Sequence, residues 1–144
     1  MDISLSFDTV ALCGRCRLDR GDLATGDDLE TAVLISLFTD ARALPDDEID
    51  DPSDPRGCWI DTFEGRLGSR LWELRRQKMV PEVFRRAREY AAESLQWLID
   101  DGVADSIDVD FVAMNPRGLL GLLITIHRGK ETKKYQFAWS DIHV

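Results

Sequence analysis

The sequence predicts an α+β fold with a short N-terminal β region, three helices and a C-terminal three-stranded antiparallel meander. Three patterns lead to this class. Apolar and polar residues alternate over residues 3–7, the apolar residues between Val83 and Leu98 follow helical spacing, and beyond Gly102 the period returns to two. A length of 144 residues suits one core, so we expect a single domain over residues 1–144.

The three helices are predicted from their end signals. The first begins near Thr25, which resembles the start of a capping box, and its apolar surface predicts burial on most sides. The second opens at Gly68-Ser69 with Ser69 as N-cap, and basic residues near its C-terminal end complement the helix dipole. The third begins at Pro81, which suits the first helical position, and stops at Gly102.

Helical periodicity stops from Ala41 to Arg56, where prolines interrupt a run of acids. We expect a surface loop here, and a loop of this length is the first place to look for a contact site. After Gly102, three strands are predicted around turns at residues 115–118 and 128–130. The last strand, from Lys133 to Trp139, is expected at a sheet edge, where a partner can add a strand.

The charge pattern bears on partners. A net charge of −9 argues against nucleic acid, because phosphate binding depends on Lys and Arg. No apolar run approaches the length that crosses a membrane, and the N-terminus lacks signal-peptide features, so we expect a cytoplasmic origin. An acidic stretch over residues 46–54 and a basic one over residues 66–88 suit docking between proteins, although solvated faces that neutralise each other are the commoner explanation.

One short motif could carry chemistry, the CxxC at Cys13-Gly14-Arg15-Cys16. Zinc normally needs four ligands, and the chain has no second CxxC; Cys58 with His127 or His143 could complete a site only by coincidence of folding. A redox CxxC follows a strand in a βαβ pattern, which is missing here. We therefore interpret the two cysteines as small residues of a β-turn with reduced thiols.

The carboxylates give no convincing active site. They cluster in a loop rich in Pro and Asp, where both members of a catalytic pair would stay solvated and ionised. Residues 46–57 do not match a calcium loop, because Asp51 stands where Gly is required. With no nucleophile turn and no phosphate-binding Gly-rich loop, the sequence predicts no catalytic residue, no cofactor and no metal, and hence a protein that is not an enzyme.

Five segments carry a family resemblance, in order along nearly the whole chain: Gly21–Thr25, Leu29–Asp40, Arg56–Asp61, Gly68–Trp72 and Ala92–Leu98. Together they resemble the small baseplate protein of Mu-like phages, a family related to the wedge protein that initiates the sheath in contractile tails. The sequence departs from that pattern at Cys58 and Ile60, where a second Trp and a Gly are expected.

The resemblance implies a structural component of a contractile phage or prophage tail baseplate, which docks to wedge proteins and helps to initiate sheath assembly. Several copies would surround the tail tube and bind other wedge proteins and the sheath, with no nucleic acid or membrane as partner. The protein would be located in the virion tail, after assembly in the host cytoplasm. The alternative hypothesis is a tail-associated peptidoglycan hydrolase.

Six residues are the candidate partner-binding residues. In the wider wedge family a Glu-Pro-Arg signature after the first helix contacts the wedge core, and Arg42 is its candidate counterpart, although a helix-end cation explains it equally well. Trp59 is the interface candidate among the tryptophans, whereas Trp72 and Trp97 are expected inside. The remaining four candidates are the residues beside Trp59 and in the basic stretch: Arg56, Asp61, Arg75 and Arg76.

Overall fold

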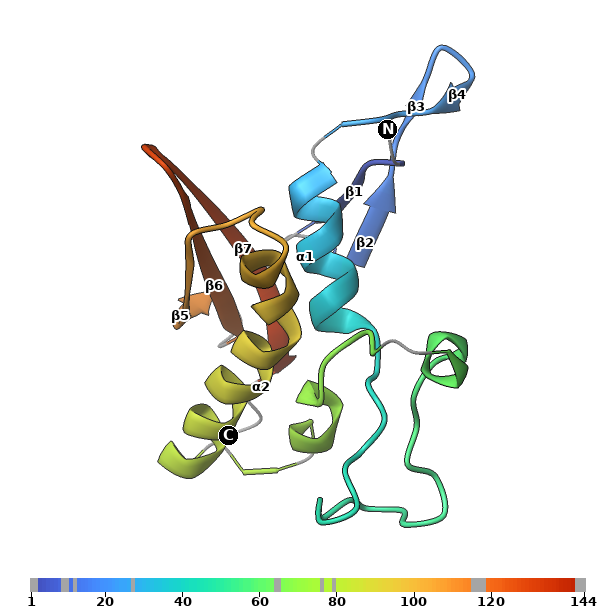
Figure 1. Ribbon diagram of the computed structural model, residues 1–144, viewed down its shortest axis with the longest axis vertical. Coiled ribbons are helices and arrows are strands. Elements are labelled where there is room, and N and C mark those ends of the chain that lie inside the picture. The colour runs from blue at the N-terminus through green and yellow to red at the C-terminus, as the bar shows by residue number, and fades with distance from the viewer. Residues whose placement is uncertain are drawn as a thin grey trace. The chain divides into compact units, whose positions relative to one another are not determined.

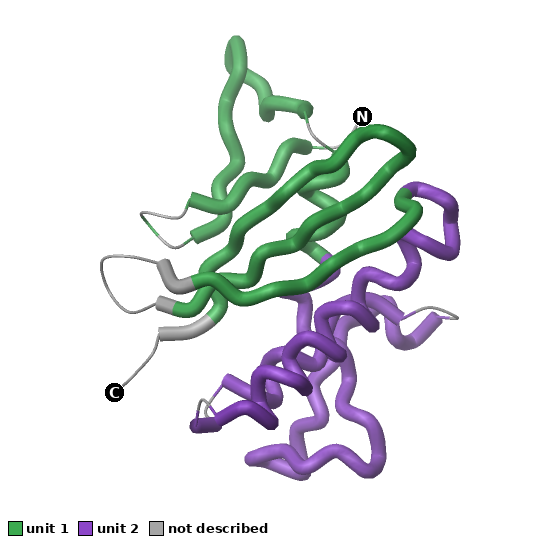
Figure 2. The backbone as a smooth tube through the Cα atoms, turned by 90° about the vertical axis from the view of Figure 1, so that its left-hand side faces the viewer, with its two compact units in different colours: residues 1–35, 104–144 green, residues 36–103 purple. Residues whose placement is uncertain are grey.

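The computed structural model describes residues 3–8, 11, 13–26, 28–63, 66–75, 77–78, 80–114 and 119–141 (Figure 1). Within these residues the chain forms seven strands in three sheets, two α-helices and two short 3₁₀ helices, η1 and η2. They divide into two compact units, residues 1–35 with 104–144 and residues 36–103, which are coloured separately in Figure 2. The expected single domain over residues 1–144 stays a prediction.

The first unit contains the C-terminal meander, which has the predicted three antiparallel strands. They are β5 (Ser106–Met114), β6 (Leu119–Arg128) and β7 (Glu131–Asp141), in the order β5-β6-β7, so that β7 lies at an edge. Every second residue of β6 from Leu120 to Ile126 is buried, because alternate side chains of a strand share one face. Leu122, Ile124 and Phe137 are at most 1% exposed. The predicted turn at residues 115–118 lies outside the described residues.

The N-terminal β region consists of two hairpins. Strand β1 (Leu5–Asp8) pairs with β2 (Cys13–Cys16), and β3 (Leu18–Asp19) pairs with β4 (Asp22–Leu23). Phe7 of β1 meets the ring of Phe137 edge-on with centroids 6.0 Å apart. The first hairpin is therefore packed on the meander within this unit.

The first helix, α1, begins later than predicted and spans Asp28–Phe38. Thr25, near which the start was predicted, lies three residues before the helix and pairs with Ile3 in an isolated antiparallel bridge. The burial expected on most sides is incomplete: Val33 is fully buried, whereas Ile35 and Phe38 are 38% and 39% exposed.

The prediction of three helices is wrong, although the class is α+β. Where the structure describes the segment expected to form the second helix, its helical part is the single turn η2 (Leu71–Leu74). Ser69, the expected N-cap, instead forms a parallel bridge with Asp40, and its hydroxyl donates to the carbonyl of Leu37. A single turn is too short to be stable as an isolated helix, so these distant contacts decide the conformation.

The helix predicted from Pro81 to Gly102 is confirmed as α2 (Pro81–Asp100), with Pro81 in the first turn. Gly102 has a φ of 73° just after the C-cap and donates its N–H to the carbonyl of Ile99, which is the usual role of a glycine that ends a helix. The buried positions of α2 follow the predicted helical spacing, and α2 packs against η2. None of the helices in the described ranges is both long and apolar enough to cross a membrane.

Candidate docking site

Two aromatic side chains stand exposed at one short turn of the second unit. Trp59 and Phe63 lie at the start and just beyond the end of η1 (Trp59–Thr62), and they are 73% and 67% exposed. Their rings meet edge-on, with centroids 6.0 Å apart and an interplanar angle of 86°. We call these two residues the aromatic pair. Large aromatic side chains are costly to leave in water, and Trp is enriched where partners bind, so this surface is the candidate docking site.

Asp61 stabilises the η1 turn that carries the aromatic pair. The amide of Cys58 donates to Oδ2 of Asp61 at 2.8 Å, and the amide of Asp61 donates to the carbonyl of Cys58 at 3.0 Å. Gly57 has a φ of 111°, and a Cβ there would lie 2.6 Å from Oδ2 of Asp61 and 3.2 Å from Cβ of Arg42. The backbone at residue 57 can come this close to Asp61 and Arg42 only because glycine has no Cβ.

Arg56, which lies just before the same turn, links it to residues elsewhere in this unit. Its Nη1 donates to Oδ2 of Asp40 at 2.7 Å, and its guanidinium lies over the Trp72 ring, 4.7 Å from the centroid. The indole N–H of Trp72 in turn donates to the carbonyl of Ala41 at 2.8 Å. Arg56 also adopts a φ of 54°, which is uncommon for a residue with a side chain and is tolerated where surrounding contacts fix the backbone.

Three of the predicted site residues lie close to Gly57 and to the turn that presents Trp59. Arg56 directly precedes Gly57, Asp61 lies within the turn, and Arg42 lies beside Gly57 in space. Their positions indicate that Arg56 and Asp61 support the turn, whereas Trp59 forms its exposed surface. Arg42 is exposed, and its carbonyl accepts a hydrogen bond from Arg66 at 3.1 Å.

The two remaining predicted site residues are not part of this group. Arg75 caps η2 and is exposed, and no hydrogen bond or ion pair among the described residues links it to the turn. Arg76 lies outside the described residues. The expectation for Trp97 is also not met, because its ring is 39% exposed while its indole N–H donates to Oγ of Ser36 at 3.0 Å. Trp72 is half-buried.

The acidic loop before the turn has a defined internal structure. The amide of Ala43 donates to the carbonyl of Pro55 at 2.9 Å, so the two ends of the loop lie together. Leu44 and Asp47 close a turn, in which the Leu44 amide donates to Oδ2 of Asp47 at 2.7 Å. The loop is thus fastened to itself as well as to the rest of the unit.

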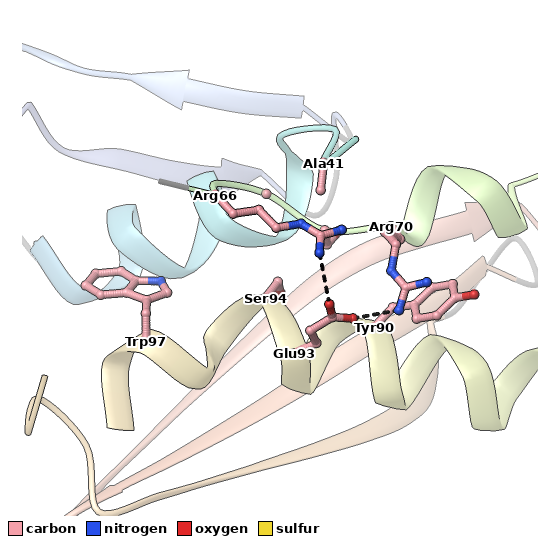
Figure 3. Close-up of a pocket in the computed structure, with 9 residues that line it drawn as sticks. Ala41, Arg66, Arg70, Tyr90, Glu93, Ser94 and Trp97 are labelled. Atoms are coloured by element: carbon pink, nitrogen blue, oxygen red, sulfur yellow. Dashed lines mark hydrogen bonds and ion pairs between the residues drawn. The ribbon is translucent and has the colours of Figure 1, made fainter. Parts of the chain in front are cut away.

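A half-buried ion-pair network connects that loop to α2. Nη1 of Arg70 donates to both carboxylate oxygens of Asp47 at 2.9 and 3.0 Å, and its Nη2 donates to Glu93 at 2.8 Å. The guanidinium also lies over the Tyr90 ring, 4.1 Å from the centroid. Figure 3 shows Arg70 and Arg66 converging on Glu93 beside a small cavity of about 110 Å³. A cavity of this size holds one side chain or a few waters, and it is smaller than most cofactor sites.

Glu73 is the acidic residue that sequence reasoning missed. It is only 8% exposed, and neither carboxyl oxygen accepts a hydrogen bond from a donor in the described part of the chain. Burial, and then the neighbouring Asp47 carboxyl, raise the pKa of Glu73 to about 7. The signal was an acid inside the apolar run Leu71-Trp72-Glu73-Leu74.

The Asp47 side of this pair carries the negative charge. Burial alone would raise the pKa of Asp47, but hydrogen bonds from the Leu44 amide, Glu73 and Arg70 outweigh burial and hold the pKa below its ordinary value. A protonated Glu73 can therefore donate to an ionised Asp47. Because the carboxyl oxygens of Glu73 are inaccessible, a substrate cannot reach them in this conformation.

The CxxC is not in a β-turn as expected, because Cys13–Cys16 forms the strand β2 opposite β1. Residues three apart on a strand point to opposite faces and lie roughly 10 Å apart, so these two thiols cannot meet on one ion or in one disulfide. Both are exposed and free. Among the described residues, no group of three or more His, Cys, Asp or Glu could hold a metal ion. His127 pairs with Asp108 at 2.9 Å, and His143 lies outside the described residues.

Comparison with known proteins gives one family. The family model described as "Phage protein GP46" matches residues 29–133. The chain is 50% identical over 90 residues to "Baseplate protein gp46" of Escherichia phage Mu, a match that covers 61% of this chain and 62% of the Mu protein. It is 38% identical over 133 residues to "Mu-like prophage FluMu protein gp46" of Haemophilus influenzae, which covers 83% of this chain and 90% of that protein.

Proposed function

Because the chain belongs to the GP46 family of phage proteins, we propose that it is a structural component of the tail baseplate of a Mu-like phage or prophage. The expectation that it resembles a Mu-like baseplate protein is confirmed by this family membership. The two compact units are proposed to act as one wedge-like baseplate domain over residues 1–144. The virion tail is its place of action, and its assembly takes place in the host cytoplasm.

Docking to neighbouring wedge proteins is proposed to occur through the aromatic pair, and the exposure of Trp59 and Phe63 is the observation that carries this proposal. Burying an aromatic side chain of this size stabilises a contact by roughly 1.5–3 kcal/mol. The hydrogen bonds of Arg56 and Asp61 restrain the turn, which lowers the entropy lost when a partner covers it, and Arg42 beside Gly57 is proposed to contact the partner.

Sheath initiation is proposed to use a different surface, the edge strand β7. An edge strand can pair with an added strand, and Glu131–Lys134 at its start are exposed. The basic residues Arg75 and Arg76 are proposed to serve further wedge contacts through charge complementarity. Several copies act together in the assembled baseplate.

The competing proposal is a tail-associated peptidoglycan hydrolase. Its best catalytic candidate is Glu73, since a general acid needs a raised pKa, and the pKa of Glu73 is raised to about 7. The inaccessible carboxyl oxygens of Glu73 favour the structural role. A hydrolase would lose cell-wall cleavage in Glu73→Gln with its fold intact, whereas a structural protein would have no such activity to lose.

The test of the docking proposal is capture from a lysate that expresses a whole Mu-like tail gene cluster, with this chain tagged. We expect the tagged protein to capture baseplate and sheath proteins, and the Trp59→Ala/Phe63→Ala variant to lose the baseplate neighbours by about tenfold or more, because two large apolar contacts are removed.

The matched control is Ile35→Ala, which truncates another exposed apolar residue and should leave capture unchanged. Thermal unfolding of both variants shows whether the fold is retained. Equal capture by the wild type and by the Trp59→Ala/Phe63→Ala variant would exclude the aromatic pair as the docking surface. Failure of the wild type to capture any tail protein would overturn the baseplate role.

A further inference from the structure

Asp47 attaches the acidic loop to the rest of the second unit. Its carboxylate accepts two hydrogen bonds from Nη1 of Arg70, at 2.9 and 3.0 Å, and a third from the Leu44 amide at 2.7 Å. The side chain of Asp47 is 12% exposed, whereas the residues before and after it in the loop are exposed. At this point of the loop, therefore, the side chain that turns inward is a charged one.

Glu73 lies against Asp47 on the short helix η2. It is buried, and neither of its carboxyl oxygens accepts a hydrogen bond from a donor in the described part of the chain. The two carboxyls are close enough for one to donate a hydrogen bond to the other, which requires one proton between them. Because Arg70 already binds the carboxylate of Asp47, that proton resides on Glu73.

The charged groups around this carboxyl pair come from η2 and α2. Arg70, which directly precedes η2, donates from Nη2 to Glu93 of α2 at 2.8 Å, and Glu93 also meets Arg66 at 3.6 Å (Figure 3). Arg86 of α2 attracts an ionised carboxyl at position 73, but its own Nη2 donates to the hydroxyl of Tyr90 at 3.0 Å. Ionisation of both carboxyls therefore adds a buried negative charge that has no hydrogen-bond donor of its own in the described part of the chain.

The acidic loop is the part of this cluster that can move away. Glu73 lies between the buried first and last leucines of η2, which packs against α2, so removing it would disrupt the core. Asp47 lies in irregular structure, and the two ends of the loop remain joined where the Ala43 amide donates to the carbonyl of Pro55 at 2.9 Å. Breaking the contacts of Asp47 therefore frees the loop between those ends and leaves the helices in place.

We propose that Asp47 and Glu73 form a proton-dependent latch, which holds the acidic loop while they share a proton and releases it when both are ionised. Release brings Glu73 into contact with water and separates Asp47 from Arg70. The latch does not rest on the proposed baseplate role, because it depends only on contacts within the second unit.

The direction of the pH dependence follows from Glu73. Burial, and then the Asp47 carboxyl, raise its pKa from 4.5 to about 7 in the held state. Between these two values the held state binds more protons than the released state, so rising pH favours release. Below this range both states carry the proton, and above it neither does, so the balance between them then changes little.

Hydrogen exchange of the Leu44 amide in the full-length chain tests the latch. The acceptor of this amide is Oδ2 of Asp47, so release of the loop exposes the amide to exchange. The protection factor, which divides the intrinsic exchange rate by the measured rate, removes the intrinsic effect of pH on exchange. We expect the protection factor of Leu44 to fall about tenfold per pH unit between pH 5 and pH 7 and to change little from pH 7 to pH 8.

The variant Glu73→Gln keeps a donor for Asp47 and cannot ionise, so the protection factor of its Leu44 amide should not depend on pH. The matched control Glu82→Gln removes an exposed carboxylate from α2 and should follow the wild type. The Phe63 amide of the η1 turn, which donates to the carbonyl of Ile60, should keep a constant protection factor in all three proteins.

A Leu44 protection factor that stays constant with pH in the wild type would overturn the proposal. An equal fall in Glu73→Gln would do the same, since another group would then control the loop. The proposal is also overturned if Leu44 and Leu95, which is fully buried in α2, share one protection factor at each pH, because Glu73 would then be released only by global unfolding. Each of these results would leave the proposed baseplate role standing.

Discussion

At the scale of single residues, the pair formed by Glu73 and Asp47 has the clearest consequence for stability. The folded chain holds Glu73 in a buried site beside an acid whose own pKa is lowered. Burial raises the pKa of Glu73 from 4.5 to about 7, so the folded protein binds more protons than the unfolded chain between those two values. The free energy of unfolding must therefore fall as pH rises through this range.

Glu73→Gln should remove that fall, because the amide keeps a donor for Asp47 and does not ionise. Relative to the wild type, the variant should gain roughly 1–3 kcal/mol of stability between pH 5 and pH 8, as judged from the size of a shift of this order. Urea unfolding at the two pH values measures the difference.

The matched control is Glu82→Gln. The hydrogen bond from Arg85 lowers the pKa of the exposed Glu82, so Glu82 changes the free energy of unfolding only at more acid pH. The pKa of Asp47 is also lowered, so its contribution likewise changes at more acid pH. The control should keep the wild-type loss of stability between pH 5 and pH 8. An equal loss in Glu73→Gln would show that Glu73 does not titrate in this range.

At the scale of elements, η1 is stabilised by a hydrogen bond between its own Asp61 and the preceding Cys58, and by the conformation of Gly57. Four residues cannot hold a helical turn by propensity alone. Asp61 stabilises the turn by accepting a hydrogen bond from the Cys58 amide at 2.8 Å. Gly57, with its positive φ and no Cβ, leaves room for the Asp61 side chain. The position of Trp59 therefore depends on the hydrogen bond between Cys58 and Asp61 on either side of it.

Asp61→Ala should loosen the turn and weaken docking without changing any residue of the aromatic pair. Loss of a capping acceptor costs about 1 kcal/mol locally. Hydrogen exchange of the Phe63 amide, which donates to the carbonyl of Ile60 at 2.9 Å, should therefore be several-fold faster.

The comparison variant for this change is Asp51→Ala, which removes a similar acceptor, that of the Ser53 amide at 3.0 Å, outside η1. It should leave exchange at Phe63 unchanged. Unchanged exchange in Asp61→Ala itself would mean that the turn is held by other contacts.

At the scale of the whole molecule, charge governs how the chain meets its partners. The net charge of −9 combines an acidic loop with exposed arginines elsewhere, including Arg17 and Arg20. Such surfaces speed the encounter of oppositely charged partners, and salt screens them over about 8–10 Å. The buried Arg70–Asp47 pair is screened much less, because its side chains are each 12% exposed.

We predict that the association rate of the chain with its captured baseplate neighbours falls as ionic strength rises, while the dissociation rate changes little. Binding kinetics on the surface-immobilised chain, measured at a series of salt concentrations, give the two rates separately. An association rate that is independent of salt would contradict electrostatic steering as the way in which the neighbours meet.

Local sequence signals were enough to predict the meander and α2. Period-two alternation beyond Gly102 predicted the meander, since side chains of a strand alternate between faces. Pro81 and Gly102 bounded α2, because each fixes backbone geometry at its own position. Trp59, the interface candidate chosen from the sequence, is 73% exposed, and its role at an interface stays a prediction.

Tertiary structure alone decided the parts that depend on distant residues. Ser69 bonds back to Leu37 and pairs with Asp40, and this turned an expected helix into a single turn. Pairing with β1 extended the CxxC and separated its thiols. Glu73 acquired its raised pKa from burial beside Asp47, which lies 26 positions earlier in the chain. In each case the energy of a contact across the fold exceeds the local preference, which amounts to no more than about 1 kcal/mol per residue.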